Sequence, residues 1–238
     1  MARRVSSGFV VEQNNATGGV SFWEKHLNHS AADRNGVSLA SYVHAIYGLI
    51  RQAKCREILM IGCGGGTLAT MLHRQGVKVV IVDTDLRSFD IARRYFHMPE
   101  DIACHVGDGR AFLCCQTRRY DAIVLDAYAG GKIPRHLKTA RFFALVKSRL
   151  RVRNSLFLVN LLVKDDDDHV PDRFAWRLSA VWRKVRLLDA EGLDDRNAVA
   201  MAGSVQELVR PRLTLRPQVG AGKLTGELGD LDFRALRP

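Results

Sequence analysis

The sequence predicts an α/β protein with a mostly parallel, doubly wound, Rossmann-like sheet. Strand-like and helix-like segments alternate with short links from residue 38 onward, which is typical of a parallel sheet wrapped by helices. One apolar strand, Glu57–Ile61, runs directly into the glycine-rich turn Gly62–Gly66. The strands that follow along the chain end in aspartates, Asp83 first, at the edge where open parallel sheets bind ligands.

Composition excludes several other classes of protein. The chain has 238 residues, of which 47% are hydrophobic and 26% charged, so neither disorder nor a fibrous fold is expected. No apolar run approaches the roughly 20 residues that cross a bilayer, and no signal peptide is evident. The five cysteines form no CxxC pair, which indicates reduced thiols. We therefore expect a cytoplasmic protein without membrane contact.

Three regions are expected along the chain. Residues 1–37 form a small N-terminal β region, because short strand-like runs flank a turn cluster at 14–19. Residues 38–205 form the Rossmann-like domain. Residues 206–238 contain three of the six prolines, so we expect an irregular tail.

Within the central region, apolar periodicity predicts each element in order. The expected helices are 38–50, 67–75, 86–96, 139–150 and 174–182, and the expected strands are 57–61, 77–82, 102–106, 120–125, 155–162 and a closing pair at 185–188 and 198–202.

The glycine turn narrows the choice of ligand. A strand, a glycine-rich turn and a helix let the backbone approach a nucleotide closely. The dehydrogenase pattern GxGxxG would need glycine where Thr67 stands, and the Gly-Lys-Ser/Thr of a P-loop is absent. The chain instead has GxGxG at Gly62, Gly64 and Gly66, spacing that favours the nucleoside-binding loop of the class I methyltransferase-like fold.

Acidic side chains follow the next strands. Asp83, 17 residues after Gly66 and next to Thr84, can accept hydrogen bonds from both hydroxyls of a ribose. Asp108, between Gly107 and Gly109, can accept from an adenine amino group. Asp126 follows the strand 120–125. Turn formation or helix capping is the alternative interpretation of these aspartates.

The chain resembles the spermidine synthase (polyamine aminopropyltransferase) family, in its divergent bacterial branch. The resemblance lies in ILMIGCGGGTLATML, VVIVDTDLRSFDIARRYF, CHVGDGRAFL and YDAIVLDAYAGGKIPRHLKTARFFALVKSRL. It implies transfer of an aminopropyl group from decarboxylated S-adenosylmethionine to an amine, without a metal, and a homodimer. It also implies ribose binding by Asp83 and adenine binding by Asp108. Tyr128, close to Asp126 in the chain, is a second candidate catalytic residue, expected to line the acceptor pocket.

By the same resemblance, Asp126 matches the first aspartate of the family's catalytic motif. A primary amine has a pKa of about 10, so it is almost wholly protonated at pH 7. A carboxylate can attract the ammonium group, orient it and help to remove its proton as the nitrogen attacks.

The chain departs from this family at three positions. Gly65 replaces the loop aspartate that binds the ammonium group of the donor, Ala129 replaces the second aspartate of the catalytic motif, and Leu39 replaces a tyrosine of the acceptor site. Losing acids weakens a site for cations. Gly65 would not repel the carboxylate of intact S-adenosylmethionine, and backbone N–H groups at the start of the following helix would favour it. The departures therefore point to a different donor or acceptor.

Charge adds further hypotheses. The formal net charge is +11, and residues 127–164 contain nine basic residues and no acidic one. Such a surface attracts nucleic acid or an anionic substrate, although no nucleic-acid motif accompanies it.

The run Asp165–Asp168 before His169 would replace the lost acids, hold a cation or form a solvated loop. His136 is interpreted as a surface side chain and Cys63 as a packing residue.

Three functions remain open from sequence. The first is a spermidine synthase-like transferase that moves an aminopropyl or alkyl group from an adenosyl-sulfonium donor to an amine. The second is an S-adenosylmethionine-dependent methyltransferase. The third is a non-catalytic nucleoside-binding or interaction protein, for which the basic surface would be the working surface.

Overall fold

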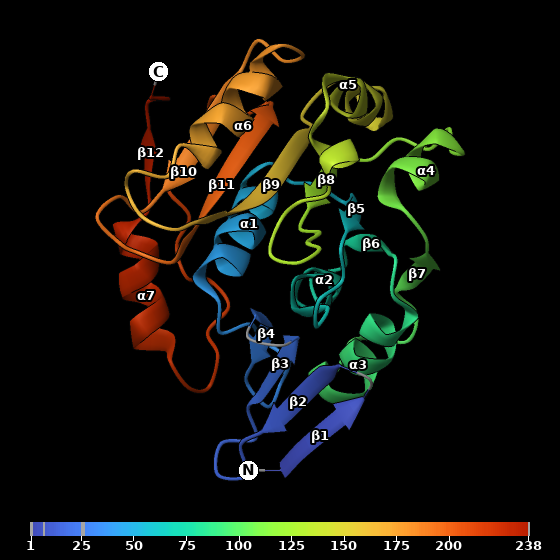
Figure 1. Ribbon diagram of the computed structural model, residues 1–238, viewed down its shortest axis with the longest axis vertical. Coiled ribbons are helices and arrows are strands. Elements are labelled where there is room, and N and C mark those ends of the chain that lie inside the picture. The colour runs from blue at the N-terminus through green and yellow to red at the C-terminus, as the bar shows by residue number, and fades with distance from the viewer. Residues whose placement is uncertain (1, 7, 25–26, 238) are drawn as a thin grey trace.

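The structure, a computed structural model, describes residues 2–6, 8–24 and 27–237. It contains a small N-terminal sheet and a large sheet with helices on both faces (Figure 1). The small sheet is antiparallel in the order β1-β2-β3-β4. Its strands are β1 (Ala2–Ser6), β2 (Phe9–Gln13), β3 (Val20–Glu24) and β4 (Leu27–Ala32).

The large sheet has the order β12-β10-β11-β9-β8-β5-β6-β7. The pairs between β5, β6, β7, β8 and β9 are parallel, whereas β10, β11 and β12 pair antiparallel at one side. This arrangement confirms the predicted mostly parallel, Rossmann-like fold. The strands are β5 (Glu57–Ile61), β6 (Lys78–Asp83), β7 (Ala103–Val106), β8 (Ala122–Leu125), β9 (Leu156–Val163), β10 (Val185–Asp189), β11 (Arg196–Gly203) and β12 (Asp232–Arg234).

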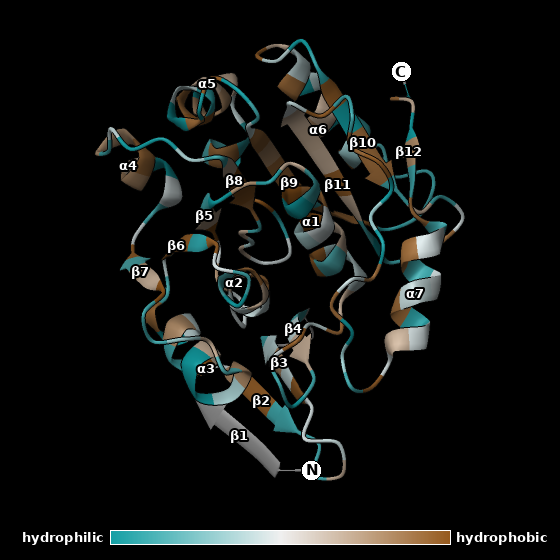
Figure 2. Ribbon diagram, turned by 180° about the vertical axis from the view of Figure 1, so that it is seen from behind, coloured by the Kyte–Doolittle hydropathy of each residue, from teal (hydrophilic) through white to brown (hydrophobic). Residues whose placement is uncertain are grey.

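Helices cover both faces because the central strands are apolar on both sides. One core cluster joins the sheet to α1, α2, α3 and α7, and a second joins it to α4, α5 and α6. Figure 2 shows the hydrophobic colour on the central strands between these layers. The helices are α1 (Ser41–Gln52), α2 (Thr67–His73), α3 (Leu86–Phe96), α4 (Gly109–Cys114), the 3₁₀ helix η1 (Arg135–Lys138), α5 (Ala140–Arg149), α6 (Val170–Ser179) and α7 (Ala221–Asp230). In the described part of the chain, no helix is long and apolar enough to cross a membrane.

The order of the strands places a ligand site at β5. The chain passes from β5 outward to β6 and β7, then returns to β8 on the other side of β5. Open parallel sheets bind ligands where the direction of winding reverses in this way, beyond the carboxyl ends of the strands. The N-terminal sheet lies at this end of the molecule (Figure 1), where Phe9 and Phe22 pack against Phe96 of α3.

The C-terminal region differs from the expected irregular tail. Residues 221–230 form α7, and Asp232–Arg234 form β12, which pairs with β10 at the edge of the large sheet. Leu224, Leu228 and Leu231 are buried, so the segment has apolar side chains that the proline count obscured. The short helices α4 and η1 were also not predicted. Helix α6 begins at Val170, four residues before the expected start, because proline is favoured in the first turn of a helix.

Buried ion pairs hold the C-terminal strand in place. Arg234 donates to Asp172 of α6 (2.7 and 2.9 Å) and to Asp189 of β10 (2.9 Å). Arg196 of β11 donates to the other side of Asp189 at 2.8 Å. Burial opposes ionisation of Asp172 and Asp189, but the arginine hydrogen bonds outweigh it, so the pKa of each carboxyl is lowered.

We predict that Arg234→Met lowers the free energy of unfolding by about 3 kcal/mol, because it leaves two buried carboxylates short of a partner. Urea unfolding at pH 7 measures this change, and exposed Arg216→Met is the matched control. Since the folded-state pKa values are lowered, the stabilisation is present above the unfolded pKa of about 4 and is lost as the pH falls below it. Equal stability of the two variants at pH 7 would contradict the role of Arg234.

Candidate active site

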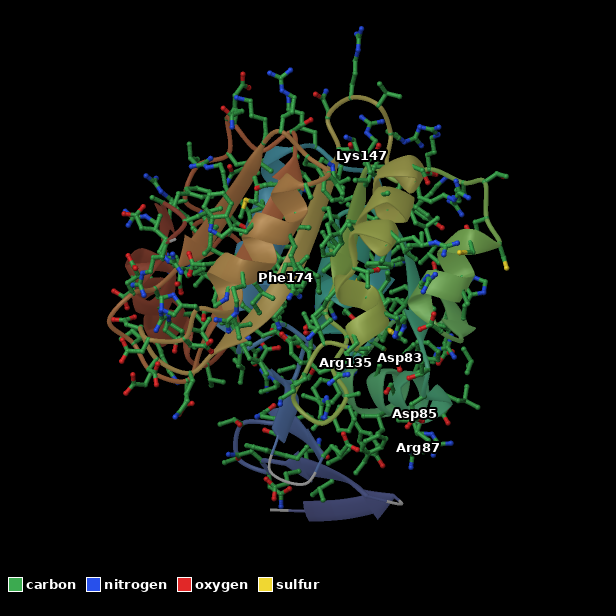
Figure 3. The ribbon with its side chains drawn as sticks, turned by 45° about the horizontal axis from the view of Figure 1, so that its top comes forward. Asp83, Asp85, Arg87, Arg135, Lys147 and Phe174 are labelled. Atoms are coloured by element: carbon green, nitrogen blue, oxygen red, sulfur yellow. The ribbon has the colours of Figure 1, made fainter. Side chains whose placement is uncertain are left out.

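A pocket of about 550 Å³ lies at the carboxyl edge of the large sheet. This volume is within the range of small-molecule sites, roughly 300–1,000 Å³. Residues that follow β5, β6 and β8 line one part of it, and the N-terminal sheet contributes Phe9, Phe22 and His29. In Figure 3, the labels of Asp83, Asp85 and Arg135 lie at this end of the sheet, next to the N-terminal strands.

The glycine turn brings two parallel strand ends into contact. Gly62 and Gly64 line the pocket, with φ angles of 103° and 51° that side chains rarely adopt. A Cβ atom at Gly62 would lie 2.1 Å from the backbone oxygen of Asp126. Only glycine at this position lets the turn after β5 lie directly against the segment after β8.

Gly65 and Gly66, in contrast, do not line the pocket. The N–H of Gly65 donates to Ser30 Oγ of β4 at 2.8 Å. A Cβ atom at Gly65 would lie 2.8 Å from the Ser30 Cβ and 2.9 Å from the Phe96 ring. Gly66 begins α2 with φ 65°, and its N–H donates to Cys63 O. The Gly65 N–H is therefore already paired with Ser30, whereas binding of a donor carboxylate by the N–H groups at the start of α2 stays a prediction.

Asp83 lies at the end of β6 beside the glycine turn. Its Oδ2 accepts from the Cys63 N–H at 2.8 Å, and its Oδ1 accepts from the Asp85 N–H at 2.9 Å. Burial raises the pKa of Asp83, and these two hydrogen bonds offset part of the increase. Each carboxylate oxygen keeps a second lone pair, so both can still accept a hydroxyl group. Thr84 lines the pocket next to it.

Asp108 lies on the same side of the pocket, between Gly107 and Gly109, which also line it. Its Oδ1 accepts from the Ala111 N–H and caps α4, and its Oδ2 lies 2.6 Å from His136 Nε2. Burial raises the pKa of Asp108, but the bonds to Ala111 and His136 outweigh it and lower the pKa overall. Asp108 therefore acts as a helix cap, as the alternative interpretation from sequence proposed, and it also contacts η1 through His136. Binding of adenine by Asp108 stays a prediction.

Asp126 lies deep in the pocket with a donor on each oxygen. Asn160 Nδ2 of β9 donates to Oδ1 at 2.8 Å, and the Tyr42 hydroxyl of α1 donates to Oδ2 at 3.2 Å. The Asn160 amide is itself oriented by Asn197 Nδ2, which donates to Asn160 Oδ1 at 2.9 Å. Burial raises the pKa of Asp126, and the bonds from Asn160 and Tyr42 counteract the increase. The result is an oriented carboxylate that is more basic than an exposed aspartate.

Tyr128 also lines the pocket, but both functions of its hydroxyl are in use. It donates to Asn160 O at 2.7 Å and accepts from the Leu162 N–H at 3.2 Å. Burial raises the pKa of Tyr128, and the charge of Asp126 adds to the increase. These contacts tie the segment after Asp126 to β9. Tyr128 therefore acts as a wall and an anchor, and the structure gives no free hydroxyl for proton transfer there.

The acidic run at 165–168 does not line the pocket. Asp166 accepts from the Gly192 N–H and pairs with Arg196 at 2.9 Å, and Asp168 accepts from the Val170 N–H just before α6. These acids stabilise loops, so the hypothesis that they replace the lost acids of the site is wrong. Among the described residues, no group of three or more histidine, cysteine, aspartate or glutamate side chains is placed to hold a metal ion.

Several pocket residues were not identified from sequence. Tyr42 supplies a phenol near Asp126 although Leu39 occupies the expected tyrosine position, and Asn160 was considered only as part of a buried strand. The position of Asn160 on the otherwise apolar strand SLFLVNLL is the one signal that could have revealed it. Ser30 and His29 had no such signal. His136, interpreted as a surface side chain, lines the pocket.

Comparisons with known proteins agree with this fold. A family model described as a methyltransferase domain matches residues 58–148. A probable polyamine aminopropyl transferase of Bifidobacterium longum is 30% identical over 136 residues, which are 56% of this chain and 30% of that protein. An N-terminal histidine N-methyltransferase of Emericella nidulans is 32% identical over 114 residues, 46% of this chain and 20% of that protein. The chain thus spans less than a third of either relative.

Among solved structures, a probable spermidine synthase from Corynebacterium glutamicum superposes with a TM-score of 0.76 at 18% identity, covering 99% of this chain and 90% of the other. The fold is that of a class I methyltransferase domain. Over part of its length the chain is similar to polyamine aminopropyltransferases, and it shares its fold with a spermidine synthase, in agreement with the resemblance noted from sequence.

We predict that an aspartate at position 65 of the glycine turn destabilises the fold. Gly65→Asp forces a side chain against Ser30 and Phe96, and overpacking of this kind costs about 1–3 kcal/mol in the free energy of unfolding. Urea unfolding measures the loss, with Gly226→Asp, where a Cβ meets open space, as the control. Unchanged stability of Gly65→Asp would show that the turn has room for an acid.

Proposed function

We propose that the chain transfers an aminopropyl or other alkyl group from an adenosyl-sulfonium donor to an amine. The single observation that carries the proposal is the position of Asp126. Its carboxylate is half-buried, is oriented by Asn160 and Tyr42, and belongs to a residue whose backbone lies against the glycine turn that would hold a nucleoside. We extend the proposal to S-adenosylmethionine or its decarboxylated form as donor. The homodimer and the cytoplasmic location stay predictions.

Each residue has a distinct task in this proposal. Asp83 accepts hydrogen bonds from the ribose, while Gly62 and Gly64 allow the backbone to approach it. Asp126 attracts the ammonium group of the acceptor and takes up its proton as the nitrogen attacks. A raised pKa makes Asp126 a better proton acceptor, and its position fixes the nitrogen relative to the donor. The leaving group is a neutral thioether, so these residues suffice for the proton and the geometry.

Methyl transfer is the second candidate. The resemblance to an N-methyltransferase favours it, as do the absence of a second carboxylate at Ala129 and of a loop acid at Gly65. The third possibility, a nucleoside-binding protein without turnover, predicts that Asp126 is dispensable.

We predict that Asp83→Ala weakens nucleoside binding at least about a hundredfold, because two hydrogen bonds to a charged group are lost. Asp126→Asn keeps the shape of the pocket and leaves nucleoside binding intact. It lowers turnover by about 10²–10⁴-fold through loss of the proton acceptor. Titration calorimetry with S-adenosylmethionine, its decarboxylated form and methylthioadenosine measures binding, and release of the thioether nucleoside measures turnover.

Equal loss of binding in the two variants would refute the role of Asp126. Turnover that is unaffected by Asp126→Asn would support a different proton acceptor. Tighter binding of the decarboxylated donor favours aminopropyl transfer, whereas preference for intact S-adenosylmethionine favours methyl or aminocarboxypropyl transfer.

We predict that Tyr42→Phe moves the acidic limb of the pH–rate profile to higher pH. The Tyr42 hydrogen bond lowers the pKa of Asp126, so its removal raises that pKa and protonates the carboxylate at a pH where it is otherwise ionised. Turnover at pH values well above the limb is largely retained. Tyr47→Phe, a buried tyrosine of the same helix that does not line the pocket, is the control. A limb that moves to lower pH, or moves equally in both variants, contradicts this arrangement.

A further inference from the structure

The acids that line the pocket are almost all committed to other partners. Besides Asp126 they are Glu24, Asp83, Asp85 and Asp108. Glu24 lies 3.3 Å from His29 Nε2, and Asp85 pairs with Arg87. Asp83 accepts two backbone N–H groups, and Asp108 caps α4 and lies beside His136. Asp126, whose oxygens accept from Asn160 and Tyr42, is the pocket carboxylate that the proposed function assigns to the amine, whereas Asp83 is assigned to the ribose.

The segment that follows Asp126 has the opposite charge at its outer end. It lines the pocket with Tyr128, Gly130, Gly131, Pro134 and His136, and it bears Lys132, Arg135 and Lys138 between and after them. Figure 3 shows Arg135 on this loop, at the same end of the molecule as Asp83 and far from Lys147 at the other end of α5. The loop therefore has a carboxylate at its start, Asp126, and basic side chains from Lys132 onward.

These basic side chains are grouped and lack acidic partners. Together with Arg177 of α6 they form the basic rim, which we define as Lys132, Arg135, Lys138 and Arg177. Lys132, Arg135 and Lys138 are flanked in the chain by residues that line the pocket, namely Gly131, Pro134, His136 and Leu137. Burial lowers the pKa of Lys138, and the charges of Arg177, Arg135 and Lys132 lower it further, so each of these three groups lies near enough to repel Lys138. None of the four has a salt bridge among the residues that the structure describes, whereas Arg151 of the same acid-free stretch pairs with Glu57 and Asp121.

A group of mutually repelling cations beside a pocket favours an anion, because the anion relieves the repulsion as well as gaining its own attraction. The same basic side chains would repel a second ammonium group. We propose that the acceptor is an amine that also carries an anionic group, a carboxylate or a phosphate, bound with its nitrogen at Asp126 and its anionic end at the basic rim. The inference rests on the proposed function for the identity of the site, and it names the acceptor class.

The test uses a matched set of four-carbon amines: 4-aminobutanoate, 1,4-diaminobutane and butylamine, with O-phosphoethanolamine as the phosphate probe. Titration calorimetry on the full chain at low salt, with and without methylthioadenosine, measures each affinity. We expect 4-aminobutanoate or O-phosphoethanolamine to bind at least about tenfold more tightly than 1,4-diaminobutane, since several unit charges act over a short distance. Comparing the two anionic probes distinguishes a carboxylate site from a phosphate site.

Charge reversal tests the rim itself. We expect Arg135→Glu and Lys138→Glu each to weaken the anionic probe by about tenfold and to leave butylamine unchanged. Arg135→Lys keeps the charge and rescues binding. Arg153→Glu makes the same change in an exposed loop between α5 and β9, where no neighbouring residue lines the pocket, and serves as the control. Thermal unfolding checks that every variant is folded.

The outcomes separate this inference from the proposed function. Tighter binding of 1,4-diaminobutane, no binding of any amine, or rim variants that match Arg153→Glu would each overturn the inference while binding of the donor nucleoside still supports the proposed function. Failure of all nucleosides to bind would refute the proposed function. The order of amine affinities without nucleoside would still decide whether the rim selects an anion.

Discussion

Contact between two neighbouring loops governs the rest of the site. The strands β5 and β8 run parallel side by side, and the turn after β5 lies directly on the backbone of Asp126 after β8. Glycine at position 62 is what permits this approach, because any Cβ atom there would overlap the Asp126 carbonyl oxygen. The nucleoside loop and the candidate proton acceptor are therefore positioned by one backbone contact. Their separation is fixed by the sheet and not by flexible side chains.

The polar side chains around this contact come from distant parts of the chain. Tyr42 lies 84 residues from Asp126 in sequence, Asn160 lies 34 residues away, and Ser30 lies 35 residues from Gly65. Each satisfies a polar group that would otherwise be buried without a partner, at a cost of roughly 1–3 kcal/mol. The hydrogen bonds from Asn160 and Tyr42 thus also orient the Asp126 carboxylate and lower its pKa.

The sequence predicted the features that depend on local pattern. Apolar strands buried on both faces, the GxGxG turn and the aspartates at strand ends follow from neighbouring residues, and they placed Gly62, Asp83 and Asp126 at one edge. Contacts between distant segments left no such pattern. The hydrogen bond from Gly65 to Ser30 depends on how the N-terminal sheet packs, and β12 depends on Arg234 meeting two buried acids. The contacts of Asp166 with Arg196 and of Asp168 with the Val170 N–H likewise form only once β11 and α6 are in place.

The departures from the spermidine synthase pattern form a consistent set. The glycine turn has no space for an acid, because Ser30 and Phe96 occupy the position that its side chain would take. The remaining pocket acids are held by backbone groups or basic side chains, and Ala129 adds none. A site that merely lost its acids would be left neutral. The loop after Asp126 bears Lys132, Arg135 and Lys138, none of which has a salt bridge among the residues that the structure describes. Under the proposal that this loop binds an anion, the acceptor changes while Asp126 is kept for the amine, which favours altered specificity over simple loss of function.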